Sequence, residues 1–273
     1  MAAYGCHHTL SFFIAGAAPA PLFLKTISMP KTWIIPDIHG CAATLQMLLE
    51  QQIKPDKSDR LIFLGDYIDR GPDSKGVIDV IMKLQEEGYT VSPLKGNHEE
   101  SCVKAWQADK ERKRFLGMKT KTFQQKEWEA FGGKQTLQSF GVKWASEIPE
   151  KYIRWLDALE YFVADDKFVA VHAGLNFTED DPFADKRSML WIRDFRIVPE
   201  KIGHRVLIHG HVPVNLELID MAVRHKHPDF IDLDNGIYMS DKAGYGNLVA
   251  LEAGSMEYRV QTVVDEVHYN KPF

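Results

Sequence analysis

Residues 60–73, with the sequence RLIFLGDYIDRGPD, decide the fold. The apolar run 60–64 predicts a buried β-strand, and the polar, glycine-containing segment 65–73 predicts a loop. Residues 74–87 have helical spacing, and Asp73 or Ser74 can accept hydrogen bonds from the first free amides of that helix. The stretch therefore predicts a strand, a loop and a helix, in that order.

The same unit occurs on both sides of this stretch. On the amino-terminal side, residues 32–36 are an apolar run, an Asp-Ile-His-Gly turn follows, and residues 42–53 have helical spacing. On the carboxyl-terminal side, we expect a strand at 89–94, a short loop at 95–97 and a helix from about residue 98 to residue 110. Three successive units of this kind imply parallel strands whose carboxyl ends lie at one edge of a sheet. We therefore expect the three loops to converge.

The rest of the chain predicts a helical insertion and then a mainly β half. Residues 107–150 are rich in Lys, Gln, Glu and aromatic side chains, with Gly132-Gly133 as a break, and we expect a helical insertion beside the loops. From residue 161 onward, strand-like runs joined by turns occur at 161–164, 168–172, 206–209, 230–232, 247–252 and 258–264. No linker divides the two halves, so we expect one domain over residues 30–273.

Composition and charge exclude several classes of protein. The chain has 273 residues, of which 45% are hydrophobic and 26% charged, which is typical of a folded soluble protein. The formal net charge of -5 gives no overall attraction to a nucleic-acid backbone, so we expect no nucleic-acid partner. Three widely spaced cysteines fit no disulfide framework and favour a reducing compartment, most simply the cytoplasm. No pattern in the sequence predicts an oligomeric state.

Residues 1–29 differ from the rest of the chain. The segment 10–24 is apolar and rich in small residues, but Pro19 and Pro21 interrupt it, and it is too short to span a bilayer. No Lys or Arg precedes it, which disfavours a signal peptide for export. Because Met29 lies shortly before the first strand, an over-called translation start is the favoured interpretation. We expect the folded domain to begin at residue 30 and to have no membrane partner.

Side chains that bind metal ions occur in all three loops and after later strands. The candidate ligands are Asp37, His39, Asp66, Asn97, His172 and His211. This mixture of carboxylate, imidazole and amide oxygen suits manganese, iron or zinc and lacks the thiolates of a structural zinc site. Its size suits two ions, with Asp66 as the bridging carboxylate. Two divalent ions against two aspartates leave a surplus of about two positive charges, which favours phosphoryl chemistry.

The sequence resembles the phosphoprotein phosphatase branch of the calcineurin-like metallophosphoesterases, especially the compact bacterial and phage serine/threonine phosphatases. The matching segments, in family order, are Asp37-Ile-His39-Gly40, Gly65-Asp66-Tyr-Ile-Asp69-Arg70-Gly71, Gly96-Asn97-His98-Glu99, His172-Ala-Gly and His209-Gly-His211. Weaker likeness covers residues 190–193 and 231–236. The sequence departs from the family at Pro36, where glycine is usual, and at Val212, where threonine is frequent.

The resemblance implies an α/β fold, the four-layer α/β/β/α sandwich with two mixed sheets. It also implies the distribution of the ligands: one metal would be held by Asp37, His39 and Asp66, and the other by Asp66, Asn97, His172 and His211. Two divalent ions are expected, in the first place manganese, with iron or zinc as alternatives.

The same resemblance implies roles for residues that bind no metal. Arg70 and Arg193 would hold phosphate oxygens, as guanidinium groups commonly do. His98 would be the general acid that protonates the leaving alkoxide, with Asp69 orienting its ring. A hydroxide bound to the metals would attack phosphorus in line.

The function implied is a metallophosphatase, a phosphomonoester hydrolase that resembles serine/threonine protein phosphatases and acts on phosphorylated protein or small phosphoesters. One alternative is a symmetrical dinucleoside tetraphosphatase, against which Asp69 argues because those enzymes often lack an acid there. A non-catalytic binding scaffold is the second alternative, and the complete ligand set argues against it.

Several other residues have a plainer interpretation. Cys41 is expected to be a buried small hydrophobe rather than an oxidation-sensitive thiol. His209 is expected to end a strand, and Arg193 has the alternative of a surface ion pair with its neighbour Asp194. The remaining histidines and the basic cluster at 110–121 are expected to face solvent.

Overall fold

The computed structural model describes residues 1–2, 5, 29–112 and 120–267. The expectations about the segment 10–24 and His268, and most of the basic cluster at 110–121, lie outside the described residues.

The first sheet contains the three strands of the repeated unit. Its order is β3-β2-β1-β8-β9. The strands β1 (Thr32–Ile35), β2 (Arg60–Phe63) and β3 (Thr90–Pro93) are parallel, and Ile34 is paired with Ile62 in the register. Strands β8 (Asn247–Glu252) and β9 (Glu257–Thr262) extend the sheet in antiparallel pairing. The predicted parallel strands are therefore confirmed.

The second sheet contains the strands of the carboxyl-terminal half, in the order β4-β5-β6-β7. Strands β5 (Phe168–Val171), β6 (Val206–His209) and β7 (Phe230–Asp232) are parallel, and β4 (Phe162–Ala164) pairs with β5 in antiparallel fashion. Both sheets are thus mixed, and each has a block of three parallel strands.

The helices of the first half follow the predicted units. Helix α1 (Ala42–Met47) continues as a wider, π-type segment (Leu48–Ile53), and α2 (Ser74–Glu86) begins after Asp73, whose side chain accepts a hydrogen bond from the Gly76 amide. Helix α3 (Asn97–Glu111) follows β3. The boundaries differ from the expected ones by one or two residues.

The segment after α3 is a chain of short helices. They are α4 (Phe123–Trp128), a π-type turn (Glu129–Gly133), α5 (Lys134–Ser139), a short 3-10 turn (Ala145–Glu147) and α6 (Glu150–Asp157). The break falls at Gly132, whose φ of 115° is a conformation that glycine adopts readily. In the second half the helical segments are α7 (Lys186–Trp191), the 3-10 turn Pro199–Ile202 and α8 (Leu216–Arg224).

The two sheets pack face to face between two outer layers. Alternate strand residues divide between the layers, because successive side chains of a strand point to opposite faces. Ile34 and Ile62 face the second sheet, where they join Ala170 and Ile208 in one buried cluster. Their neighbours Trp33, Ile35, Leu61 and Phe63 pack against the helices of the first half.

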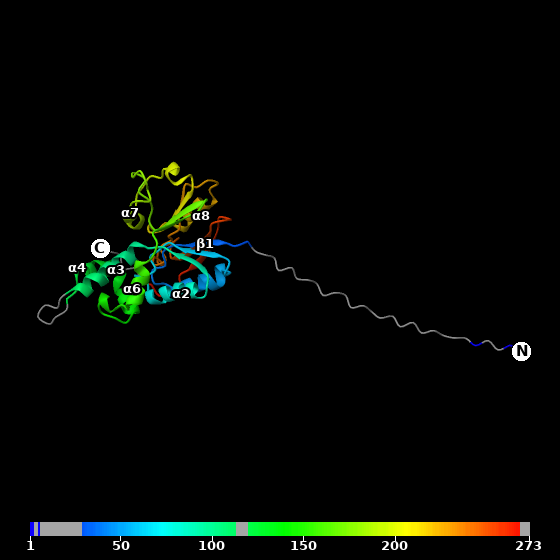
Figure 1. Ribbon diagram of the computed structural model, residues 1–273, viewed down its shortest axis with the longest axis horizontal. Helices are drawn as coiled ribbons and strands as arrows, with labels where there is room; N and C mark the ends of the chain where they lie inside the picture. The colour runs from blue at the N-terminus through cyan, green and yellow to red at the C-terminus, as the bar shows by residue number, and fades with distance from the viewer. Residues whose placement is uncertain (3–4, 6–28, 113–119, 268–273) are drawn as a thin grey trace.

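The outer layers differ in thickness. Figure 1 shows α2, α3, α4 and α6 on one side of the sheet that contains β1, and α7 and α8 on the other side. The outer face of the second sheet, with Val169 and Leu207, is covered by Met189 of α7, by Ile202 and by loop residues. The four-layer α/β/β/α arrangement is confirmed, with a thin fourth layer. Among the described residues, no helix is both long and apolar enough to cross a membrane.

The packing between the sheets gives a stability prediction. Ile62 is fully buried between the two sheets, so Ile62→Ala should lower the free energy of unfolding by about 2 to 5 kcal/mol through lost burial and a residual cavity. Chemical denaturation measures this change. The matched control Leu218→Ala removes a side chain that is 55% exposed and should change stability by less than about 0.5 kcal/mol. Equal effects of the two substitutions would contradict the placement of Ile62.

Candidate metal centre

The six candidate ligands lie where parallel strands end. Asp37 and His39 follow β1, Asp66 follows β2, Asn97 is the first residue of α3, and His172 and His211 follow β5 and β6. All six are buried, with at most 8% of their surface exposed. The sequence prediction that these loops converge is confirmed, and loops of both sheets take part.

The backbone around the centre is unusual. A positive φ occurs at five non-glycine residues of the loops: His39, Asp66, Asp69, Arg70 and His211. This conformation is uncommon for residues with a Cβ and is typical of functional sites that the surrounding structure over-determines.

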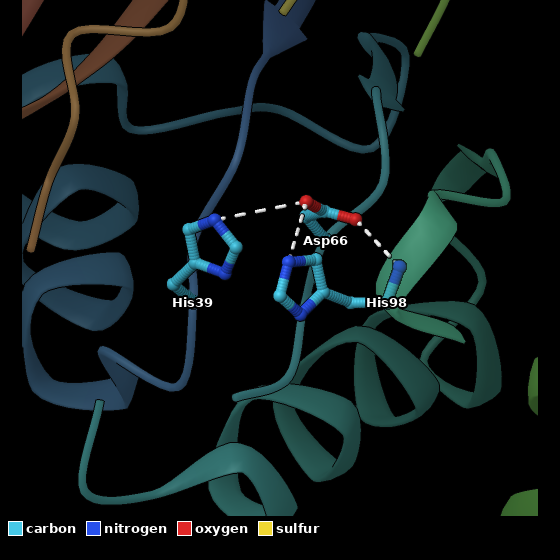
Figure 2. Close-up of side chains that lie close together, drawn as sticks. All are labelled: His39, Asp66 and His98. Carbon is cyan, nitrogen blue, oxygen red and sulfur yellow. Dashed lines mark hydrogen bonds and ion pairs between the residues drawn. The ribbon is translucent and has the colours of Figure 1, made fainter. Parts of the chain in front are cut away.

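Asp66 lies in the middle of the six residues. Its Oδ2 atom is 3.6 Å from Nε2 of His39 and 3.7 Å from Nε2 of His98, as Figure 2 shows. Its Oδ1 atom is 3.5 Å from Nε2 of His172 and accepts a hydrogen bond from the His98 amide at 3.2 Å. The two oxygens of Asp66 therefore face two different groups of side chains.

On the Oδ1 side, acceptor atoms of His172 and Asn97 face each other, and the ring of His211 lies beside them. Nδ1 of His172 donates to the carbonyl of Leu64 at 3.1 Å, which leaves Nε2 of the neutral ring with a lone pair. That atom lies 2.9 Å from Oδ1 of Asn97 and 3.2 Å from Nδ1 of His211. Facing lone pairs repel one another unless a cation lies among them. This side of Asp66 therefore fits a divalent ion.

The group on the Oδ2 side has the same character. Nδ1 of His39 donates to the carbonyl of Ile68 at 3.1 Å, so its Nε2 carries the lone pair, and Oδ2 of Asp37 lies 3.9 Å from that atom. Oδ2 of Asp37 is buried and has no hydrogen-bond partner among the described residues. A backbone carbonyl that fixes the other ring nitrogen is the usual arrangement around a metal-binding histidine.

The electrostatics of the centre favour the binding of positive charge. Burial raises the pKa of Asp37 well above its usual value, and the charges of Asp234 and Asp66 raise it further. Burial also raises the pKa of Asp66. Burial lowers the pKa of His39 and His172, which keeps these rings in the neutral form that binds metal. Imidazole, carboxylate and amide oxygen donors on both sides of Asp66 fit two divalent cations of borderline hardness.

His98, Asp69 and Arg70 lie beside the Oδ2 side of Asp66. Nδ1 of His98 is 2.7 Å from Oδ2 of Asp69, and Nη2 of Arg70 is 3.2 Å from Nε2 of His98. Since a guanidinium group can only donate, Nε2 of His98 accepts and Nδ1 carries the proton that it donates to Asp69. Burial raises the pKa of Asp69 to about 7, while hydrogen bonds from Thr136 and Trp128 lower it.

The two arginines have different surroundings. Arg70 is half-buried, its guanidinium group lies 4.2 Å from the ring centre of Tyr238, and its Nη1 is 2.5 Å from Nε2 of His39. Arg193 follows α7 and is exposed, but its charge contributes, after burial, to lowering the pKa of His211 to about 3. Both positive charges therefore act on the edge of the metal centre.

Glu99 is a structural residue of the site whose role the sequence analysis missed. Its fully buried carboxylate accepts hydrogen bonds from the amides of Asp66 at 2.8 Å, Tyr67 at 2.9 Å and Gly96 at 2.8 Å. It therefore ties the second loop to the third. A glutamate three residues into a helix, as in a capping box, was the sequence pattern that could have identified it.

Asp234 was also missed. It follows β7, is 1% exposed, and its Oδ2 has no hydrogen-bond partner among the described residues, while Oδ1 accepts from the Gly236 amide at 2.7 Å. Its charge is one of the causes that raise the pKa of Asp37, so the two carboxylates lie close together. Its position after a third parallel strand of the second sheet was the signal that could have found it.

Other residues have the plainer roles that were expected. Cys41 is buried, and burial raises the pKa of its thiol. His209 ends β6 and stacks on Phe230, outside the two ligand groups. His204, His225 and His227 are exposed.

Comparison with known proteins identifies the family to which this site belongs. The family model described as calcineurin-like phosphoesterase matches residues 30–239. A serine/threonine-protein phosphatase 2 of Escherichia coli is 41% identical over 75 residues, which are 28% of this chain and 32% of that protein. A serine/threonine-protein phosphatase 1 of Salmonella typhimurium is 38% identical over 73 residues, 27% of this chain and 32% of that protein.

A second kind of relative is equally similar. A symmetrical bis(5'-nucleosyl)-tetraphosphatase of Buchnera aphidicola is 37% identical over 73 residues, 27% of this chain and 26% of that protein. The chain therefore spans about a third or less of the length of the curated relatives it matches.

Solved structures agree on the fold. A protein serine/threonine phosphatase of Saccharomyces cerevisiae aligns over 90% of this chain and 83% of that chain with a TM-score of 0.56 and 13% identity. A putative diadenosine tetraphosphatase aligns over 87% of this chain and 95% of that chain with a TM-score of 0.51 and 19% identity. At these identities the likeness shows a shared fold.

The contacts of Glu99 give a prediction about the centre. In Glu99→Gln an amide group replaces a carboxylate that accepts three backbone hydrogen bonds, and its NH2 must face at least one backbone amide. We expect a loss of about 1 to 3 kcal/mol in the free energy of unfolding and roughly 10- to 100-fold weaker binding of divalent metal. Chemical denaturation and metal titration measure the two effects. In the control Glu111→Gln, an exposed residue of the same helix, both quantities should stay at the parent value. Parent-like metal affinity in Glu99→Gln would show that Glu99 does not hold the Asp66 loop.

Proposed function

The chain belongs to the calcineurin-like phosphoesterase family, and from this premise we propose that it is a metal-dependent phosphomonoester hydrolase, in the first place a serine/threonine protein phosphatase. Its substrates would be phosphorylated proteins or small phosphoesters.

The observation that carries the proposal is the pairing of His98 with Asp69 beside Asp66. The leaving group of a phosphoserine or phosphothreonine ester is an alkoxide, a strong base that departs only when it receives a proton. A phosphoanhydride releases a phosphate group, a much weaker base that has less need of one. A buried imidazole whose Nδ1 is held by a carboxylate at 2.7 Å can give the alkoxide a proton from Nε2 once both of its ring nitrogens are protonated.

The other residues of the site would bind the phosphate group and the metal ions. Arg70 offers guanidinium donors at the edge of the centre, where they can bind equatorial oxygens of a phosphate dianion. Arg193, exposed and close enough to influence His211, is proposed as a second donor. Asp37, His39, Asp66, Asn97, His172 and His211 would hold two divalent ions, which when bound supply positive charge for the phosphoryl oxygens and lower the pKa of water.

Space for the alcohol part of the substrate adjoins His98. A pocket of about 280 Å³ lies between α3, the short helices after it and α7, with Glu100, Lys104, Phe131 and Trp191 in its lining. The ring centre of Phe131 is 6.5 Å from that of His98. We therefore propose this pocket as the place of the alcohol part of the substrate.

Two further assignments belong to the proposal. Manganese is proposed as the native metal, because the ligands are oxygen and imidazole donors without thiolate. A cytoplasmic location is proposed from the cysteines, since Cys41 and Cys102 are both free and buried. No nucleic-acid or membrane partner is proposed.

The second candidate is hydrolysis of symmetrical dinucleoside tetraphosphates. It is favoured by the relatives and the solved structure that carry such names. The same metal centre would serve, because attack on phosphorus is common to both reactions. A non-catalytic scaffold is disfavoured by the convergence of all six ligands with His98.

Initial rates with manganese on phosphoserine peptides, small phosphomonoesters and diadenosine tetraphosphate separate these functions. We expect phosphopeptides to have the highest kcat/KM, activity to disappear with a chelator, and manganese to restore it. His98→Asn should lower kcat on the phosphopeptide by roughly 10²- to 10⁴-fold, because the proton donor is lost. The control His225→Asn, at an exposed position, should match the parent. A higher kcat/KM on the dinucleotide would establish the second candidate, and no hydrolysis of any of these substrates would contradict both.

A further inference from the structure

The carboxylate of Asp69 is held by two side chains from distant parts of the chain, besides His98. Trp128 is the last residue of α4, and its Nε1 donates to Oδ2 of Asp69 at 2.8 Å. Thr136 lies in α5, and its Oγ1 donates to Oδ1 of Asp69 at 2.5 Å. Trp128, Thr136, Asp69 and His98 are each at most 2% exposed. The short helices after α3 thus reach the hydrogen-bond network of His98 directly.

The direction of the protons in this network follows from the donor inventory. An indole nitrogen can only donate, so Oδ2 of Asp69 accepts from Trp128 and also from Nδ1 of His98. Thr136 also receives the amide proton of Asp69 at 2.9 Å, and its oxygen lies 2.9 Å from Oγ of Ser74. With three donors, the Asp69 carboxylate has a fixed position and a fixed orientation.

Two glycines allow the segment from α4 to α5 to lie close to the loop that contains Asp69. Gly132 accepts a hydrogen bond from the Arg70 amide at 3.3 Å, and a Cβ there would lie 2.8 Å from that same nitrogen. A Cβ on Gly133 would lie 2.5 Å from the indole of Trp128. The break between α4 and α5 therefore packs directly on the loop of Asp69 and Arg70, so that Trp128 and Thr136 both face one carboxylate.

We propose that Trp128 and Thr136 are positioning residues of the hydrolytic site, which hold Asp69 so that the His98 ring presents Nε2 to the leaving oxygen. The proposal rests on the proposed function, in which His98 is the proton donor. In this proposal the segment from α4 to α5 supports proton donation by His98 and is not a separate cap.

Trp128 and Thr136 serve the step in which His98 protonates the leaving alcohol. His98 first carries a proton on both ring nitrogens. When the bond from phosphorus to the alcohol oxygen breaks, that oxygen takes the Nε2 proton, which leaves the neutral ring with its proton on Nδ1. Water supplies the oxygen that replaces the alcohol on phosphorus, and its released proton returns to His98 through solvent. The Nδ1 proton stays on His98 and remains hydrogen-bonded to Asp69 throughout. Loss of the Trp128 or Thr136 donor frees the carboxylate to turn, and the ring that it holds then loses its alignment.

Two esters with different leaving groups test the proposal. Phenyl phosphate needs a proton on its leaving oxygen, whereas 2,4-dinitrophenyl phosphate releases a weakly basic phenolate that does not. Trp128→Phe and Thr136→Val should each lower kcat on phenyl phosphate by about tenfold and on the dinitrophenyl ester by less than about twofold, with KM nearly unchanged. Thr136→Val keeps the side-chain shape and serves if Trp128→Phe fails to fold. Trp106→Phe is the matched control, because its indole donates to the carbonyl of Ile148, away from the site. Equal losses on both esters, or none on either, would overturn the proposal.

A second measurement separates this proposal from the proposed function. In proton NMR of the zinc-loaded protein, the His98 Nδ1 proton should appear far downfield because of its hydrogen bond to Asp69. It should shift upfield or exchange faster in Trp128→Phe and Thr136→Val, and stay unchanged in Trp106→Phe. If the parent hydrolyses neither ester, the phosphatase function is wrong, while this proton still reports the positioning. An unchanged proton in both variants would overturn the positioning role.

Discussion

The rest of the structure depends on a carboxylate, that of Asp66, which is buried between two groups of hydrogen-bond acceptors. A buried negative charge beside a second one, Asp37, is costly unless positive charge and hydrogen bonds compensate for it. The amide of His98 compensates part of the charge, and Glu99 holds the backbone of Asp66 in place. Nε2 of His39 lies 3.6 Å from one oxygen and Nε2 of His172 lies 3.5 Å from the other, so a ring nitrogen and a carboxylate oxygen could hold a cation together on each side.

This constraint explains why the two sheets are arranged as they are. The first sheet supplies Asp37, His39 and Asp66, and the second supplies His172 and His211, each from the carboxyl end of a parallel strand. The amide of His211 donates to Oδ1 of Asp37, so the sheets are joined at that edge as well as through their shared apolar core. The antiparallel strands β8, β9 and β4 extend the sheets but bring no candidate ligand to the edge where the metal centre lies. The fold therefore serves to bring two sets of loops to one carboxylate.

The sequence predicted the parts of the site that depend on local pattern. The candidate ligands could be singled out because each follows an apolar run and because the carboxyl ends of parallel strands meet at one edge. The contacts of Trp128 and Thr136 with Asp69 span 59 and 67 residues and have no local pattern, so the Gly132-Gly133 break could be seen but its purpose could not. Asp234 also follows a parallel strand, which placed it at the same edge, but its closeness to Asp37 depends on tertiary packing. Helix ends shifted by a residue or two, as in α3, which begins at Asn97 rather than at about residue 98.

The central claim is that two metal ions share Asp66. A crystal structure of the manganese-loaded protein, with anomalous diffraction data that locate manganese directly, tests this claim. We predict two peaks roughly 3.5 to 4 Å apart, with one oxygen of Asp66 or both bound to the pair so that the carboxylate contacts each ion. A single peak, or two ions of which Asp66 contacts only one, would contradict the shared-carboxylate centre.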